Sequence, residues 1–146
     1  MTTTTRSVVV AQDGSSGFFR IANEATNSVI PFTVLMSGGA DVPPVNTTAT
    51  GSGLLSPIGN ELNYNITYSG LSAVATAAHI HGPADTNGVA MVLQPLTGRF
   101  ATSGTLAGKQ VLAQSQLTNV IDGMTYMNIH NTSHPNGEIR GQAVFQ

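Results

Sequence analysis

Four histidines occur in this chain of 146 residues, and they fall in two short segments. His79 and His81 form a His-x-His pair, and His130 and His134 flank the sequence Asn-Thr-Ser. Residues i and i+2 of a β-strand share one face and lie about 6.6 Å apart, so the first two rings can converge on one ion. If the two segments are neighbours in space, His79, His81, His130 and His134 form one site. Imidazoles suit Cu(II), Zn(II) or Ni(II), whereas Mg²⁺ and Ca²⁺ prefer oxygen ligands.

The alternative is that these are ordinary surface or hydrogen-bonded histidines. The gathering of all four in two segments favours the metal site. Because a protonated imidazole cannot bind a metal, we expect the metal affinity to fall as the pH drops through ~6.5.

Four polar residues are candidates for contacts around the metal ligands. Glu138 and Arg140 share a face of the strand expected after the second histidine segment, where Glu138 could orient an imidazole and Arg140 could attract an anion. The alternative for this pair is an exposed salt bridge or a contact that stabilises the turn. Asp85 is a candidate oxygen ligand of the metal or a hydrogen-bond acceptor beside the ligands, or the cap of the turn 85–88. Asn128 shares the strand face of His130, and we expect it either to line the site or to satisfy backbone groups.

The elements that must position these residues have the two-residue period of β-strands. In the segment 62–68, Leu62, Tyr64, Ile66 and Tyr68 share one face and polar residues occupy the other, which predicts a half-buried antiparallel strand. Turn sequences rich in Gly, Asn and Pro separate similar segments, at spacings typical of an all-β, antiparallel Greek-key sandwich or barrel. The other predicted strands are 7–11, 18–22, 29–36, 48–55, 72–81, 89–93, 99–106, 111–117, 125–130 and 138–145.

Composition excludes several classes of function. Charged residues make up 8% of the chain, the net charge is −2, and no Lys/Arg cluster exists, which argues against nucleic-acid binding. The absence of cysteine excludes disulfides, thiolate nucleophiles and zinc fingers. No apolar run is long enough for a membrane span. The sequence contains no familiar catalytic motif, so we predict no catalytic residues.

Residues 1–28 contain two short predicted strands joined by a Gly/Ser turn, and we treat them separately from residues 29–146, which we expect to form the main domain. The first segment is an extra hairpin on the sandwich, or an arm that pairs with a neighbouring molecule. Its apolar stretches Val8–Val10 and Phe18-Phe19 lack charged residues that would protect an exposed edge. We therefore expect a homo-oligomer, with a filament as a further option.

Three segments in order resemble the CHRD domain family, which is named after chordin and is widespread among exported bacterial proteins. They are Asp41–Val45, Ala78–Ala84 and Tyr126–Gln142, and the resemblance covers residues 32–146. It implies an immunoglobulin-like or superoxide-dismutase-like β-sandwich. The His-x-His strand also looks like the copper-ligand strand of Cu,Zn superoxide dismutase. This chain departs from that enzyme in lacking a cysteine pair and a second, zinc-type ligand set.

Together these features predict an exported metal-binding protein that binds copper, with zinc as the alternative metal. Its role would be copper storage, copper delivery or a redox reaction at the bound copper. A dismutase-like enzyme is a minor option. The alternative class is a structural or adhesive subunit of the cell surface or of an extracellular filament. We expect an extracellular, cell-surface or periplasmic location. Residues 1–6 have no apolar core of a signal peptide after them, so the leader would be absent from this chain.

Overall fold

The computed structural model describes residues 10–11, 20–21 and 31–145 and divides the chain into two units, residues 1–30 and 31–146. In the first unit, strand β1 (Val10–Ala11) pairs antiparallel with β2 (Arg20–Ile21), and Val10 lies opposite Ile21. The remainder of the predicted N-terminal strands, with Phe18-Phe19 and most of Val8–Val10, lies outside the described residues.

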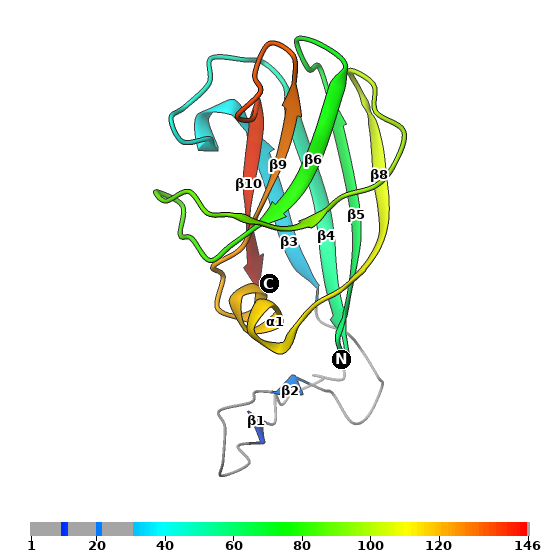
Figure 1. The fold of residues 1–146 in the computed structure, drawn as a ribbon, viewed down its shortest axis with the longest axis vertical. Coiled ribbons are helices and arrows are strands. Elements are labelled where there is room, and N and C mark those ends of the chain that lie inside the picture. Colours follow the sequence, from blue (N-terminus) through cyan, green and yellow to red (C-terminus); the bar gives the residue numbers. More distant parts are fainter. Residues whose placement is uncertain (1–9, 12–19, 22–30, 146) are drawn as a thin grey trace, which may run out of the picture. The chain divides into compact units, whose positions relative to one another are not determined.

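The second unit is built on one eight-stranded antiparallel sheet, which confirms the predicted all-β fold class (Figure 1). The strand order is β7-β6-β9-β10-β3-β4-β5-β8. A short 3-10 helix, η1, follows β3, and helix α1 precedes β9. The bounds are β3 (Phe32–Ser37), η1 (Gly38–Ala40), β4 (Thr50–Ile58), β5 (Glu61–Ser69), β6 (Ala75–His81), β7 (Val92–Pro95), β8 (Gly104–Val111), α1 (Gln114–Ile121), β9 (Tyr126–Asn131) and β10 (Ile139–Phe145).

The two-residue alternation of β5 follows the prediction. Leu62, Tyr64, Ile66 and Tyr68 are each at most 3% exposed, while the polar residues between them face outward or are only partly covered. The burial of these large side chains in the space enclosed by the curved sheet is the main source of its stability.

The sheet curls until its two edge strands approach each other, so that it is nearly a closed barrel. Gln94 at the β7 edge donates through Nε2 to the carbonyl of Val111 on β8, at 3.3 Å. In return, Gln110 on β8 donates through Nε2 to the carbonyl of Pro95, at 2.6 Å. Side chains thus partly satisfy edge groups that no neighbouring strand pairs.

One predicted strand is wrong, and two are displaced along the chain, since the segments predicted at 89–93 and 99–106 correspond to β7 and β8. The segment 111–117 was expected to be a single strand, but β8 ends at Val111 and α1 begins at Gln114. Leu117 and Val120 lie three positions apart and are buried on one face of the helix. The Gln116 side chain accepts a hydrogen bond from the backbone N–H of Ala113, which satisfies a donor at the start of the helix. The spacing of Leu117 and Val120 suits one buried face of a helix, and this explains why the segment is helical from Gln114 onward.

The sheet face that carries the histidines points away from the core. Ile80, Met127 and Ile129 are fully buried on the inner side of β6 and β9, so His79, His81 and His130 lie on the outer side. All six residues of β9 are nevertheless buried, because the loops 82–91 and 132–138 contact its outer side. The described residues contain no helix long and apolar enough to span a membrane.

Candidate metal centre

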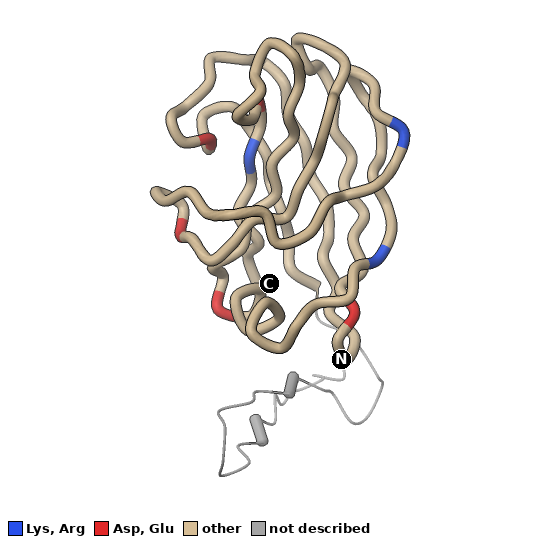
Figure 2. Tube along the Cα trace, viewed as in Figure 1, with Lys and Arg blue, Asp and Glu red and all other residues tan. Residues whose placement is uncertain are grey.

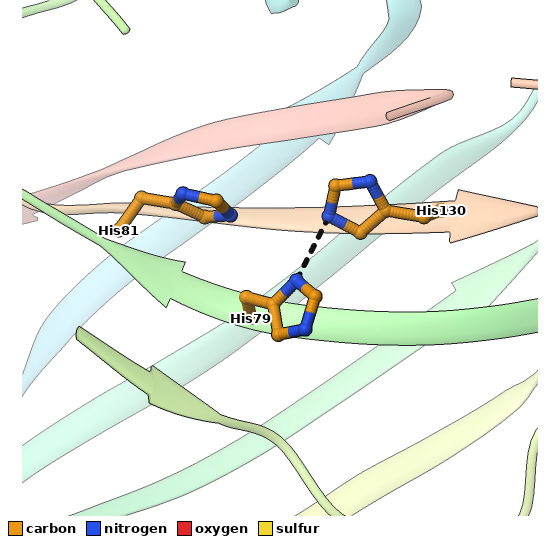
Figure 3. A group of neighbouring side chains, drawn as sticks. All are labelled: His79, His81 and His130. Atoms are coloured by element: carbon orange, nitrogen blue, oxygen red, sulfur yellow. Dashed lines mark hydrogen bonds between the residues drawn. The ribbon is translucent and has the colours of Figure 1, made fainter. Parts of the chain in front are cut away.

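Three of the four histidines come together on neighbouring strands (Figure 3). His79 and His81 are two residues apart on β6, and His130 comes from β9, where Ala77 is its pairing partner across the ladder. The Nδ1 atom of His79 lies 3.1 Å from the Nε2 atom of His130. One ligand nitrogen from each ring lies within 4.8 Å of the others. The β6–β9 pairing thus makes neighbours of segments about 50 residues apart in sequence.

The spacing of His79 and His130 suits a shared metal ion. Copper and zinc bind imidazole nitrogen at ~2.0–2.1 Å, so two ligands at angles of about 90–120° are roughly 2.9–3.6 Å apart. The 3.1 Å separation between His79 and His130 falls in that range. The His81 Nε2 atom is buried and has no hydrogen-bond partner. A metal ion would supply the partner that this buried nitrogen lacks.

Two backbone carbonyls fix the tautomers of two rings. The Nδ1 atom of His81 lies 3.0 Å from the Ala90 carbonyl, and the Nδ1 atom of His130 lies 3.1 Å from the Pro135 carbonyl. A carbonyl can only accept, so both Nδ1 atoms carry the proton and donate it. Both Nε2 atoms then present a lone pair, which is the state that metal binding requires.

The protein environment also keeps the cluster uncharged. Burial lowers the pKa of His130 to about 4, and repulsion from His79 adds to the effect. Burial and the neighbouring His81 lower the pKa of His79. For His81, burial is the largest cause of a lowered pKa, the Ala90 hydrogen bond opposes it, and Arg140 lowers it further. The rings are therefore neutral at pH 7 and available as ligands.

The Tyr126 ring packs against His81, and the Arg140 guanidinium packs on Tyr126. The Tyr126 ring stacks on the His81 ring with 4.9 Å between centroids and 4° between planes. The guanidinium carbon of Arg140 lies 3.6 Å from the Tyr126 centroid. The phenol oxygen accepts a hydrogen bond from the Ala90 N–H at 3.1 Å, so the residue that orients His81 is itself held by Tyr126. Both the His81 ring and the Arg140 guanidinium thus pack on the Tyr126 ring.

His134 does not belong to the group of three. Its backbone shapes the turn instead: its N–H donates to Asn131 Oδ1, and its carbonyl accepts from the N–H groups of Asn131 and Gly137. That turn carries the Pro135 carbonyl toward His130. The predicted four-histidine site is therefore a three-histidine group with the fourth residue in the loop beside it.

Glu138 and Arg140 are buried, at 0% and 1% exposure, so the interpretation as an exposed salt bridge is wrong. Glu138 accepts hydrogen bonds from the Thr47 hydroxyl, from the N–H and hydroxyl of Ser72, and from the Asn131 amide. Burial raises the pKa of this carboxyl, but these hydrogen bonds lower it more, so it lies below its ordinary value. Glu138 therefore ties three loops together and makes no hydrogen bond to a histidine.

The remaining two candidates, Asp85 and Asn128, make hydrogen bonds within or to loops and none to a histidine. Asp85 Oδ1 accepts hydrogen bonds from the N–H groups of Asn87 and Gly88, at 2.9 Å each, which caps the turn. Asn128 lies between His79 and Arg140 in the register of the sheet. Its amide nitrogen is 3.4 Å from Asp41 Oδ1 and 3.4 Å from the Asn136 carbonyl.

Charge is sparse around the site. Lys and Arg (blue) and Asp and Glu (red) are few and scattered in Figure 2, and no basic cluster occurs among the residues it describes. The ion pair of Lys109 with Glu61 is the one salt bridge in the described part of the chain. Arg140 instead donates to the carbonyls of Gly88 and Asp85, at 2.7 Å each. It also borders a cleft of about 670 Å³ that none of the three histidines lines.

Sequence reasoning missed the carbonyls of Ala90 and Pro135 and the role of Tyr126. Tyr126 shares a strand face with His130 at even spacing, so the two-residue period could have identified it. No side-chain pattern could have identified the carbonyls, because every residue has one.

The comparisons with known proteins bear on the same part of the chain. A family model of the CHRD domain matches residues 32–143, which include all three clustered histidines and begin with the first residue of β3. No curated protein and no solved structure matches the chain.

Proposed function

The chain belongs to the CHRD family, and we propose that it is an exported metal-binding protein that holds one copper ion through His79, His81 and His130. The observation that carries the proposal is the convergence of three ring nitrogens within 4.8 Å of one another. The orphaned His81 Nε2 and the carbonyl-fixed tautomers support it, because they leave lone pairs facing a shared space.

Copper is favoured over zinc by the chemistry of the donors. The group consists of imidazoles, without a thiolate or a carboxylate. For a given nitrogen site, the affinity order of divalent metals peaks at copper and falls again at zinc. A bound copper ion would supply one-electron redox chemistry, while the protein binds and orients the ion and limits its access to water. Storage, delivery and electron transfer all agree with such a site.

The test is metal analysis and titration calorimetry of the full chain, prepared without a histidine tag. We expect about one Cu(II) per chain, with Zn(II) binding more weakly. The double variant His79→Ala/His81→Ala is expected to lose this binding. His134→Ala is the matched control, because it removes an imidazole outside the group. Equal Cu(II) binding by the wild type and the double variant would overturn the proposal.

A second candidate function is a self-assembling subunit of a surface structure or filament. One observation favours it: the outer face of β3, β4 and β10 carries exposed Leu35, Leu54 and Val144, at 76%, 47% and 54% exposure. Thr33 pairs with both Leu54 and Val144, so these side chains are cross-strand neighbours. An exposed apolar group of this kind is typical of a contact surface between proteins.

Sedimentation velocity tests this second candidate. We expect the full chain to self-associate, and Leu35→Lys or deletion of residues 1–28 to reduce the association. Monomers for the full chain across a wide range of concentrations would rule out assembly.

A further inference from the structure

We infer that His79 controls metal uptake by the cluster: its Nδ1–H closes the metal-free site by a hydrogen bond to His130, and the ring changes tautomer to bind the metal through Nδ1. This inference rests on the proposed function, since it describes how the same three residues accept an ion.

The three rings have unequal surroundings. The Nδ1 protons of His81 and His130 are held by the carbonyls of Ala90 and Pro135. Neither ring has to change its tautomer when a metal binds, because each already offers Nε2. In the described part of the chain, His79 has no carbonyl partner, and its ring is only half-buried.

The position of His79 determines where its proton lies without metal. Its Nδ1 atom is 3.1 Å from His130 Nε2, and that atom can only accept because the His130 proton is on Nδ1. His79 must therefore donate from Nδ1 in the hydrogen bond that the dashed line in Figure 3 marks. This hydrogen bond occupies two of the nitrogens that a metal needs.

Metal binding must break this contact. The Nδ1 proton of His79 leaves to water, the metal takes the Nδ1 lone pair, and a proton from water is taken up at Nε2, so the ring stays neutral. The second nitrogen of His79 points away from the other two rings in Figure 3. The bound state therefore uses Nδ1 of His79 and Nε2 of His81 and His130.

Nitrogen-15 NMR of the full chain tests the tautomers directly, with the diamagnetic probe Zn(II). Without metal we expect all three rings to carry the proton on Nδ1. After one equivalent of Zn(II), His79 alone is expected to change to the Nε2–H form. A metal-free His79 with its proton on Nε2, or a zinc complex in which His79 keeps the Nδ1 proton, would overturn the inference and leave the metal site intact. Absence of any zinc-induced change at the three rings would overturn the inference, and the Cu(II) titration of the wild type and the double variant then decides the proposed function separately.

Association kinetics provide a readout that simple loss of a ligand would not move. In His79→Ala, the hydrogen bond that blocks His130 Nε2 is gone. We expect Cu(II) to bind this variant about 2- to 12-fold faster, which corresponds to the worth of one hydrogen bond of about 0.5–1.5 kcal/mol, although more weakly at equilibrium. His81→Ala should weaken binding without raising the rate, and His134→Ala should change neither. Quenching of tyrosine fluorescence in a stopped-flow experiment measures the rate, and an unchanged or slower rate in His79→Ala would contradict the inference.

Discussion

At the scale of single residues, the protonation of each ring depends on the atoms around it. The carbonyls of Ala90 and Pro135 orient two rings, and burial disfavours the charged form of all three. His81 also disfavours a positive charge on His79, and His79 and His81 both disfavour one on His130. A site built in this way stays competent for metal at a pH at which ordinary histidines are protonated.

We therefore expect the copper affinity to persist below pH 6.5. Three ordinary imidazoles with a pKa near 6.5 would lose about 10³-fold in affinity between pH 7.5 and 5.5. Because the pKa values of His79, His81 and His130 are lowered, that of His130 to about 4, the loss over this range should be much smaller. Competition titrations at several pH values measure it, and a 10³-fold loss by pH 5.5 would show that the pKa values are not lowered.

At the scale of elements, the loops next to the histidine strands are held in place by hydrogen bonds to Glu138. Glu138 precedes β10 and joins the loop that contains Thr47, the loop that contains Ser72, and Asn131 at the end of β9. The loop that follows Asn131 carries the Pro135 carbonyl to His130. The orientation of His130, a proposed ligand, thus depends on a carboxylate that makes no hydrogen bond to it.

Glu138→Gln should lower the free energy of unfolding by at least ~2 kcal/mol. The amide nitrogen would face hydrogen-bond donors in a buried place, where an unsatisfied group costs about 1–3 kcal/mol. Urea denaturation measures the change. Glu61→Gln is the matched control: it breaks the exposed ion pair with Lys109 and should cost less than ~1 kcal/mol. Equal effects of the two substitutions would contradict this role of Glu138.

Gly137→Ala should weaken both folding and metal binding. Gly137 has φ of +127°, which side chains rarely adopt, and an added Cβ would meet the Asn128 side chain. The turn would have to shift, and with it the Pro135 carbonyl that orients His130. We expect a loss of more than ~1 kcal/mol in unfolding free energy together with a lower Cu(II) affinity.

Gly59→Ala is the control, because it introduces backbone strain without displacing the turn beside His130. Gly59 also has a positive φ, +62°, but its Cβ would meet no atom within 4 Å. We expect a cost of about 1 kcal/mol and no change in Cu(II) affinity. Denaturation and titration calorimetry of both variants make the comparison, and normal Cu(II) affinity in Gly137→Ala would rule out the turn's role in orienting His130.

At the scale of the whole molecule, buried titratable groups couple the fold to pH. His130 has a folded pKa of about 4 against 6.5 when unfolded, so the unfolded chain binds more protons as the pH falls. Glu138 also has a lowered pKa in the folded state, so its contribution is present above its unfolded pKa and is lost below it. Both groups therefore make the molecule less stable in acid.

We expect the metal-free protein to lose stability in two stages. The first extends from about pH 6.5 to 4 and should be smaller in His130→Ala, and the second continues below about pH 4.5 and should be smaller in Glu138→Gln. Urea midpoints at pH values from about 2.5 to 8 measure both stages. A wild-type midpoint that stays constant from pH 7 to 4.5 would contradict the assignment of the first stage to buried neutral histidine.

The alternation of side-chain types was sufficient to predict which side of β5 and of β6 faces the core. Ile80 between His79 and His81, and Ile129 beside His130, place the histidines outward wherever these segments form strands. This information is local, because neighbouring residues of a strand point to opposite faces. The same reasoning predicted β5 correctly and was wrong for the segment 111–117, where a strand-like run ends at a helix.

Only the tertiary structure decided which histidines meet. The pairing of β6 with β9 brings His130 to His79, while the turn that contains His134 is shaped by Asn131 and does not add its ring to the group. It also decided that carbonyls, and neither Glu138 nor Asp85, orient the rings of His81 and His130. Strand pairing is set by the packing of the whole sheet, and a backbone carbonyl occurs at every residue, so neither leaves a mark on side-chain types along the chain.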